Sequence, residues 1–189
     1  MKVLCAFSSH YGKLPDGWEV CRLSDLGQII GGGTPSTSES EYWNGNISWI
    51  TPADLSSYTD KYICIGNRNI TQAGLATSSA VLMPAGSVLM SSRAPIGYCV
   101  ISSKEVCTNQ GFKSIVPYVI TTNEYIYYYI KARIDEIRAR ASGTTFKEIS
   151  GTEFGNTAIF LPPLNEQHRI VKAIESAFIV INEIAENLS

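Results

Sequence analysis

The sequence predicts an α+β protein with a mixed or antiparallel sheet followed by a long C-terminal helix. Two observations predict this class. Short apolar segments separated by Gly and Pro are typical of strands joined by turns, and the end of the chain repeats apolar residues at helical spacing. The 189 residues, 44% of them hydrophobic, suffice for one domain with an appended helix. We therefore expect a domain at residues 1–162 and a helix at residues 163–189.

Candidate strands begin near the N-terminus. Trp18–Leu23 alternates apolar and polar residues, which is typical of a half-buried strand. The next segment, Ser24–Ile30, fits either a short helix or a strand and ends at three glycines. Residues 34–46 are rich in Ser and Thr and hold Pro35. We expect a long loop there, followed by a strand at residues 47–50.

The rest of the domain predicts further short strands and one amphipathic helix. The helix is expected at residues 125–137, where isoleucines recur on one face. Thr121 and Glu124 have the spacing of a capping box at its start. Apolar segments with turn residues around them predict strands at residues 81–83, 87–90, 98–101, 113–116 and 157–161.

The C-terminal segment predicts a helix with a regular apolar seam. Pro162 and Pro163 prevent the helix from extending upstream, and Asn165 is the expected N-cap. A heptad repeat of this kind is typical of a coiled coil with another helix. The alternative is that the seam packs against the core of the same chain. The seam residues, spaced alternately by four and three positions, are Ile170, Ile174, Ala177, Ile181, Ile184 and Leu188.

The cysteines and the apolar segments indicate the compartment. Five scattered cysteines, none in a CxxC pair, argue against a disulfide framework and against a zinc ribbon. The apolar run at the N-terminus is too short for a signal peptide, and no segment is long enough to span a membrane. We therefore expect a cytoplasmic protein that does not bind a membrane.

The net charge of −2 does not by itself favour nucleic acid as a partner. The local balance differs along the chain. Residues 131–147 hold five basic and two acidic residues, a balance of +3, whereas residues 148–189 hold six acidic and two basic residues, a balance of −4. Because phosphate binding depends on the local potential, this distribution permits a basic face.

Motifs for catalysis are missing from the sequence. Gly31–Ser36 is rich in glycine but lacks the Lys of a phosphate-binding P-loop, and the chain contains no GxGxxG, HExxH or GxSxG. We expect no catalytic and no metal-binding residue in this chain. A thiol hydrolase built on Cys107 and His168 is disfavoured, because no activating pattern surrounds the thiol. We expect Cys107 in the core and His168 at the surface.

Three segments combine small polar residues with a cation. They lie at residues 91–97, 107–113 and 142–147. Such segments suit DNA, since Arg reads guanine, Asn and Gln read adenine, and Ser, Thr and Lys hold phosphates. The alternative is that they are solvated turns. Trp43 and Trp49 are expected to be core residues rather than platforms for bases, because their neighbours alternate as in a strand.

The same segments resemble the specificity subunit of bacterial type I restriction–modification systems. The similarity runs in order from about Leu14 to Leu188. The similarity is specific because the segment Pro162–Gln167 leads into the heptad helix and the preceding loops match as well. The points of similarity are Leu14–Glu19 with Arg22-Leu23, Gly32–Ser36, Tyr42–Gly45 before Ile47–Thr51, Ser92-Arg93 before Ile96-Gly97, Asn109–Phe112 and Leu161–Gln167.

This resemblance implies a target recognition domain at residues 1–162 and a conserved-region helix at residues 163–189 that forms a coiled-coil spacer. Family members usually carry two such units, so the chain is expected to be a half-subunit or a fragment. The implied partners are double-stranded DNA, methyltransferase (modification) subunits, a restriction subunit, and a second copy or second half-subunit. A homodimer would read an interrupted palindrome.

The resemblance also implies a non-catalytic chain without a cofactor of its own. S-adenosylmethionine would serve the methyltransferase subunit, and ATP and Mg²⁺ the restriction subunit. Arg93 is expected to read a base, although a structural salt bridge is the alternative. The expected DNA contacts are Thr34, Ser36, Ser92, Arg93, Asn109, Gln110, Lys113, Thr145 and Lys147.

A second function from another class stays open at this point. The chain could be a stand-alone dimeric module that binds a protein or a glycan through its Ser, Thr and Tyr side chains. Its near-neutral charge fits such a module as well as it fits a DNA-binding protein. Salt-dependent binding to duplex DNA separates the two, because phosphate contacts release counterions.

Overall fold

The computed structural model describes residues 13–144 and 147–188. The chain divides into two compact units. We call residues 22–157 the sheet unit, and we call the described residues up to Cys21 together with residues 158–188 the helix unit. This division differs from the predicted one at residue 162, because the segments on both sides of the sheet unit belong with the C-terminal helix.

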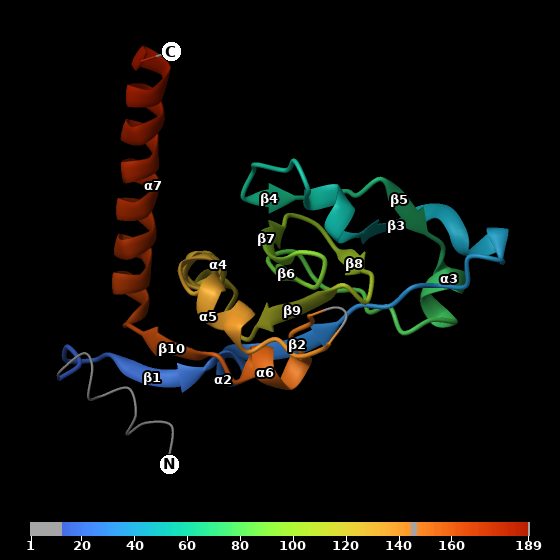
Figure 1. Ribbon diagram of the computed structural model, residues 1–189, viewed down its shortest axis with the longest axis horizontal. Coiled ribbons are helices and arrows are strands. Elements are labelled where there is room, and N and C mark those ends of the chain that lie inside the picture. Colours follow the sequence, from blue (N-terminus) through green and yellow to red (C-terminus); the bar gives the residue numbers. More distant parts are fainter. Residues whose placement is uncertain (1–12, 145–146, 189) are drawn as a thin grey trace. The chain divides into compact units, whose positions relative to one another are not determined.

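The sheet unit contains a five-stranded sheet (Figure 1). Its neighbouring strands run antiparallel except at one edge, where β4 is parallel to β7. The α+β class and the mixed sheet predicted from the sequence are therefore confirmed. In spatial order the strands are β2 (Gly27–Gly31), β9 (Phe112–Pro117), β6 (Val88–Ser92), β7 (Ile96–Ser102) and β4 (Tyr62–Ile63).

A second, three-stranded sheet is built around β3 (Trp43–Ile50), with β5 (Arg68–Ile70) antiparallel on one side and β8 (Val106–Thr108) parallel on the other. β3 begins four residues before the predicted strand at residues 47–50. The strand predicted at residues 81–83 was wrong: only Met83 pairs there, in a single bridge to Val106.

Two apolar cores lie on opposite sides of β3. Successive strand residues point to opposite faces, so Trp49 packs in one core and Ile50 in the other. The core on the Trp49 side also contains Trp43, Ile70 and Cys107. The core on the other side connects both sheets and contains Ile30, Ile50, Leu55, Ile63, Met83, Leu89, Val100, Val106 and Phe112.

The helix predicted at residues 125–137 is two helices. α4 (Asn123–Ala132) and α5 (Ile134–Ala139) are separated by Arg133, whose φ of −108° and ψ of 14° lie outside the helical region. The isoleucine face is still buried, since Ile126, Ile130 and Ile137 are inaccessible to solvent. The remaining helices and 3₁₀ turns of the unit are α2 (Leu23–Leu26), η1 (Ser40–Tyr42), η2 (Pro52–Leu55), α3 (Gln72–Ala76), η3 (Ile120–Thr122) and α6 (Gly151–Gly155).

The predicted capping box at the start of α4 was also wrong. Thr122 precedes the helix, and its hydroxyl donates a hydrogen bond to the Val119 carbonyl, 2.7 Å away. Glu124 instead forms an ion pair with Lys61 and accepts a hydrogen bond from the Tyr62 hydroxyl. The Lys61 side chain is only 19% exposed, so its charge needs a carboxylate partner. The ion pair with Lys61 is therefore more favourable for Glu124 than a hydrogen bond from a backbone amide at the start of the helix.

In the helix unit, β1 (Glu19–Arg22) pairs with β10 (Ala158–Leu161), and both strands were predicted. α7 (Leu164–Leu188) confirms the predicted long helix. Asn165 is not its N-cap: the Pro163 carbonyl already accepts hydrogen bonds from the amides of Glu166 and Gln167 at 2.8 and 3.0 Å, so the helix begins before Asn165.

The apolar seam of α7 changes along its length. Ile170 and Ile174 are half-buried, whereas Ile181, Ile184 and Leu188 are 56%, 54% and 83% exposed. Within the described ranges of the chain, no helix is long and apolar enough to cross a membrane.

Candidate nucleic-acid interface

Several of the polar segments singled out in the sequence meet at one end of the five-stranded sheet. The antiparallel pairing places Gly31 opposite Lys113 and Ser91 opposite Phe112. The residues that follow β2, the residues that follow β6 and the residues that precede β9 therefore lie together, although they are separated by tens of positions in the sequence (Figure 1). We call this region the strand-end surface.

The loop after β2 is fixed by both tryptophans of the core. The Trp49 indole N–H donates to the Gly33 carbonyl at 2.8 Å, and the Trp43 indole N–H donates to the Ser36 carbonyl at 3.0 Å. The two rings are buried and pack edge to face, with their centroids 5.1 Å apart. Their predicted place in the core is confirmed. Their polar edges hold the backbone that carries Thr34 and Ser36.

The same loop lies against the loop that precedes β9. The Gly33 amide donates to the Thr108 carbonyl at 2.9 Å, and the Thr34 hydroxyl donates to the side-chain oxygen of Gln110. A Cβ atom at Gly32 would lie 1.8 Å from the Asn109 carbonyl oxygen, so only glycine permits this approach. Two predicted contact residues from distant segments, Thr34 and Gln110, are thus in direct contact.

Asn109 shapes its own turn. Its side-chain oxygen accepts a hydrogen bond from the Gly111 amide at 2.9 Å, and its backbone amide donates to the Ile50 carbonyl at 3.0 Å. Asn109 is half-buried, whereas Gln110 beside it is exposed. The turn therefore presents Gln110 to solvent, with its amide group oriented by Thr34.

One carboxylate is shared by two cations on the strand-end surface. Glu148 lies 2.9 Å from the Lys113 ammonium group and 3.6 Å from the Arg93 guanidinium group. The three side chains together carry one net positive charge. Lys113 is 15% exposed and Arg93 is 44% exposed, so the arginine is the more accessible of the two cations. Arg93 therefore takes part in an ion pair, which was the structural alternative, and still reaches the surface.

The remaining predicted contacts differ in their accessibility. Ser36 and Lys147 are exposed. Ser92 is inaccessible to solvent, and its backbone bonds to Gly111 and Ile149. Its side chain is therefore not presented at the surface of the free chain, and its expected contact with DNA stays a prediction. Thr145 lies outside the residues that the structure describes.

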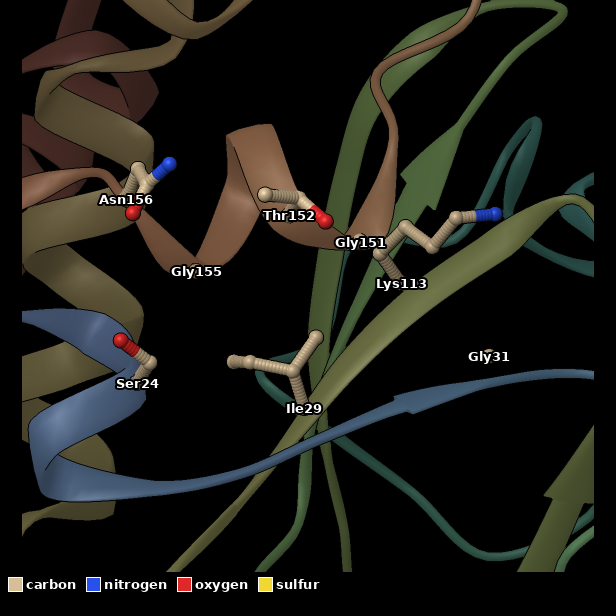
Figure 2. Close-up of a pocket in the computed structure, with 8 residues that line it drawn as sticks. All are labelled: Ser24, Ile29, Gly31, Lys113, Gly151, Thr152, Gly155 and Asn156. Carbon is tan, nitrogen blue, oxygen red and sulfur yellow. The ribbon is translucent and has the colours of Figure 1, made fainter.

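An open pocket of about 480 Å³ lies beside Lys113, between the sheet and α6 (Figure 2). Ser24 of α2, Ile29 of β2 and Thr152 of α6 surround it together with Lys113. Asn156 adds an amide group to its wall. Most of the surface that lines this pocket is apolar, so it differs in character from the polar strand-end surface beside it.

Cys107 and His168 are the two candidate residues for a thiol hydrolase. Cys107 is fully buried, as predicted, and burial raises the pKa of its thiol to about 11. His168 is exposed on α7, also as predicted. A neutral buried thiol cannot serve as the nucleophile of a hydrolase. Among the residues outside the gaps at 1–12, 145–146 and 189, no group of acidic, His and Cys side chains could hold a metal ion.

Sequence reasoning missed one cation. The Arg68 guanidinium carbon lies over the Trp43 ring, 3.6 Å from its centroid, and 5.6 Å from the centroid of Trp49. Arg68 opens the three-residue strand β5 and pairs with Trp49 across the sheet. A strand this short has no detectable alternation, so the sequence offered no signal that Arg68 faces the tryptophans.

Comparisons with known proteins identify the family of this chain. The family model of the type I restriction modification DNA specificity domain matches residues 15–189. The chain belongs to this family. It is 40% identical over 165 residues to the specificity subunit of the type I restriction enzyme MjaIX from Methanocaldococcus jannaschii. It is 31% identical over 173 residues to the specificity subunit of a type I restriction enzyme from Escherichia coli.

The family relationship covers most of this chain and less than half of each relative. The two alignments include 86% and 88% of this chain but 38% and 42% of the relatives. The crystal structure of the HsdS subunit from Thermoanaerobacter tengcongensis superposes with a TM-score of 0.72 at 23% identity, over 100% of this chain and 45% of that subunit. This similarity shows a common fold. The chain spans less than half the length of the specificity subunits that it matches.

Proposed function

We propose that this chain is a non-catalytic DNA-recognition part of a type I restriction–modification complex, and that duplex DNA lies on the strand-end surface. The observation that carries the proposal is the convergence of hydroxyl, amide and cationic side chains from three distant segments. Membership of the DNA specificity domain family supports it. The proposed contacts are Thr34, Ser36, Arg93, Asn109, Gln110, Lys113, Thr145 and Lys147.

The accessible groups suggest two kinds of contact. Arg93 and Gln110 carry the planar donor groups that read guanine and adenine in the major groove. Ser36 and Lys147 are exposed and suit phosphate oxygens, which position a protein without specifying a sequence. Lys113 is mostly covered, so its charge strengthens the local potential more than it makes contacts of its own.

The helix unit is the proposed assembly surface. The exposed isoleucines of α7 would pack against a second helix, from another copy of this chain or from a second half-subunit. The resulting coiled coil would separate two recognition domains and bind methyltransferase and restriction subunits. Methyl transfer from S-adenosylmethionine and cleavage with ATP and Mg²⁺ would then take place in those partners, in the cytoplasm.

Selection from a random duplex pool tests the proposal. The purified full chain should enrich one sequence pattern, and its affinity for that duplex should fall steeply with salt. The slope of log affinity against log salt is about −0.9 for each phosphate contact. A dimeric module for proteins or glycans would show neither enrichment nor this slope. Binding that is unaffected by salt would contradict the proposal.

A further inference from the structure

Arg68 is an exposed arginine that is held in place by stacking. Its guanidinium carbon lies 3.6 Å from the centroid of the Trp43 ring, and Trp43 is itself buried to 7% exposure. A guanidinium group on the face of an indole is attracted by the ring, and it is more weakly hydrated than an ammonium group. In the part of the chain that the structure describes, its guanidinium N–H groups make no hydrogen bond or ion pair, so they can donate to a ligand.

Arg68 differs from the other arginines in its partners. Arg22 donates a hydrogen bond to the Asn156 side chain. Within residues 13–144 and 147–188, Arg68 has no carboxylate partner. Its charge is therefore not neutralised, although its position is fixed. The arginines that form an ion pair with Asp or Glu are Arg93, Arg133, Arg138, Arg140 and Arg169.

The position of Arg68 connects it to the strand-end surface. Trp43, on which it stacks, also donates its indole N–H to the Ser36 carbonyl, and Trp49, its cross-strand neighbour, donates to the Gly33 carbonyl. The indole N–H groups of the two tryptophans thus hold the loop of Thr34 and Ser36, and the face of the Trp43 ring holds Arg68. Arg68 and this loop are presented by the same rigid pair of rings.

We propose that Arg68 is a further DNA contact, which extends the strand-end surface past the loop of Thr34 and Ser36. This inference rests on the proposed function. The guanidinium fork binds a pair of acceptor atoms, and duplex DNA offers two such pairs: O6 and N7 of guanine, and two oxygens of one phosphate. Stacking fixes the fork before DNA binds, so less conformational freedom is lost on binding.

The test uses two variants of the full chain and one charge control. Arg68→Gln keeps a planar group that can lie on the ring but removes the charge. Arg68→Lys keeps the charge but removes the fork. Lys104→Ala removes one positive charge from the exposed turn between β7 and β8, at the end of β8 away from Asn109. Because Arg68 is exposed, its variants should fold, which thermal unfolding would verify.

Affinity for the duplex selected by the wild type is then measured across a salt series. Arg68→Gln should weaken binding by about 5- to 150-fold, the range for one bidentate contact, and Lys104→Ala by less than about twofold. If the acceptor is guanine, the pattern selected by Arg68→Gln loses its preference at one position. If it is a phosphate, Arg68→Lys restores most of the affinity, and Arg68→Gln lowers the salt slope by about one.

The inference is overturned if Arg68→Gln binds the selected duplex as tightly as the Lys104→Ala control does. The proposed function would survive that result, because the wild type and the control would still select and bind DNA. If the wild type itself selects no sequence, the proposed function has failed, and the inference about Arg68 fails with it.

Discussion

The strand-end surface and the second half of α7 are both accessible, but they differ in how their side chains are held. On the strand-end surface, polar groups are held by their own chain: Thr34 and Asn109 form hydrogen bonds with Gln110 and Gly111, and Arg93 forms an ion pair with Glu148. On α7, by contrast, Ile181 and Ile184 are apolar and more than half exposed. The strand-end surface thus presents polar side chains whose positions are fixed, whereas the second half of α7 presents apolar side chains that are not covered.

This difference teaches which kind of partner each region can bind. A surface whose donors and cations are already in position loses little conformational entropy when it binds a polar ligand. A row of exposed isoleucines gains free energy only when another apolar surface covers it, at about 25 cal/mol per Å². The comparison therefore supports the proposals that DNA binds the strand-end surface and that a helix packs on α7, and each of the following predictions tests one of them.

The largest effect is expected on α7. Ile181→Asp should abolish association through the helix, because each buried isoleucine contributes about 1.5–3 kcal/mol and an unpaired carboxylate adds a desolvation cost. With two copies in a symmetric pair, the loss exceeds about 3 kcal/mol, or more than 100-fold in Kd. Sedimentation of the full chain over a concentration series measures it.

A matched control lies two residues away. Ile179 is 59% exposed, like Ile181, but it lies off the heptad seam. Ile179→Asp should leave association unchanged to within a few fold. If both variants associate as the wild type does, the seam is not an interface; if both fail equally, the effect of charge is not specific to the seam.

A smaller effect is expected on the strand-end surface. Gly32→Ala should lower the free energy of unfolding by about 2–3 kcal/mol, because its Cβ would lie 1.8 Å from the Asn109 carbonyl oxygen and the loop must shift. Gly31→Ala is the control, since no atom lies within 4 Å of the position of its Cβ. Urea unfolding compares the two, and equal stability would show that the two loops are not packed as described.

Arg93→Ala also tests the strand-end surface. The variant should lose about 1–3 kcal/mol of binding to the selected duplex, the value of one bidentate base contact. Its stability should change by less than about 1 kcal/mol, because an ion pair at 3.6 Å with a half-exposed arginine contributes little. Equal losses in stability and in DNA binding would instead indicate a purely structural residue.

The smallest effect concerns the interior of the sheet unit. Burial raises the pKa of the Cys107 thiol to about 11, so alkylation by iodoacetamide at pH 8 should modify the exposed Cys64 and spare Cys107. The folded state holds the Cys107 proton more tightly than the unfolded chain does. The free energy of unfolding should therefore fall as pH rises from about 8.5 toward 11. Rapid labelling of Cys107 at pH 8 would contradict its burial.

The sequence predicted those parts of the fold that depend on local patterns. β6, β7 and β9 have enough alternating residues between turn residues to be found, and the heptad repeat predicted α7. β4, β5 and β8 are two or three residues long and have no readable period. The break at Arg133 escaped prediction because the isoleucine pattern continues across it. The capping box failed because Glu124 has a better partner in Lys61, 63 positions away.

The candidate site was predictable as a set of residue types but not as a geometry. Segments with Arg, Lys, Asn and Gln beside small polar residues identified most members of the strand-end surface. The contact between Thr34 and Gln110 joins positions 76 residues apart, and only the sheet register creates it. Ser92 was selected for its neighbours and proved buried. Arg68 was missed because its role comes from a tryptophan ring in another strand.

The central claim is that the strand-end surface selects the DNA sequence that the complex modifies. It is tested most directly by mapping methylated bases in the genome of cells that hold the methyltransferase subunit with this chain, with its Arg93→Ala variant, or with no specificity subunit. We predict a methylated pattern that requires this chain and that Arg93→Ala erases or alters at one position. The same methylated sites in all three cells would contradict the account.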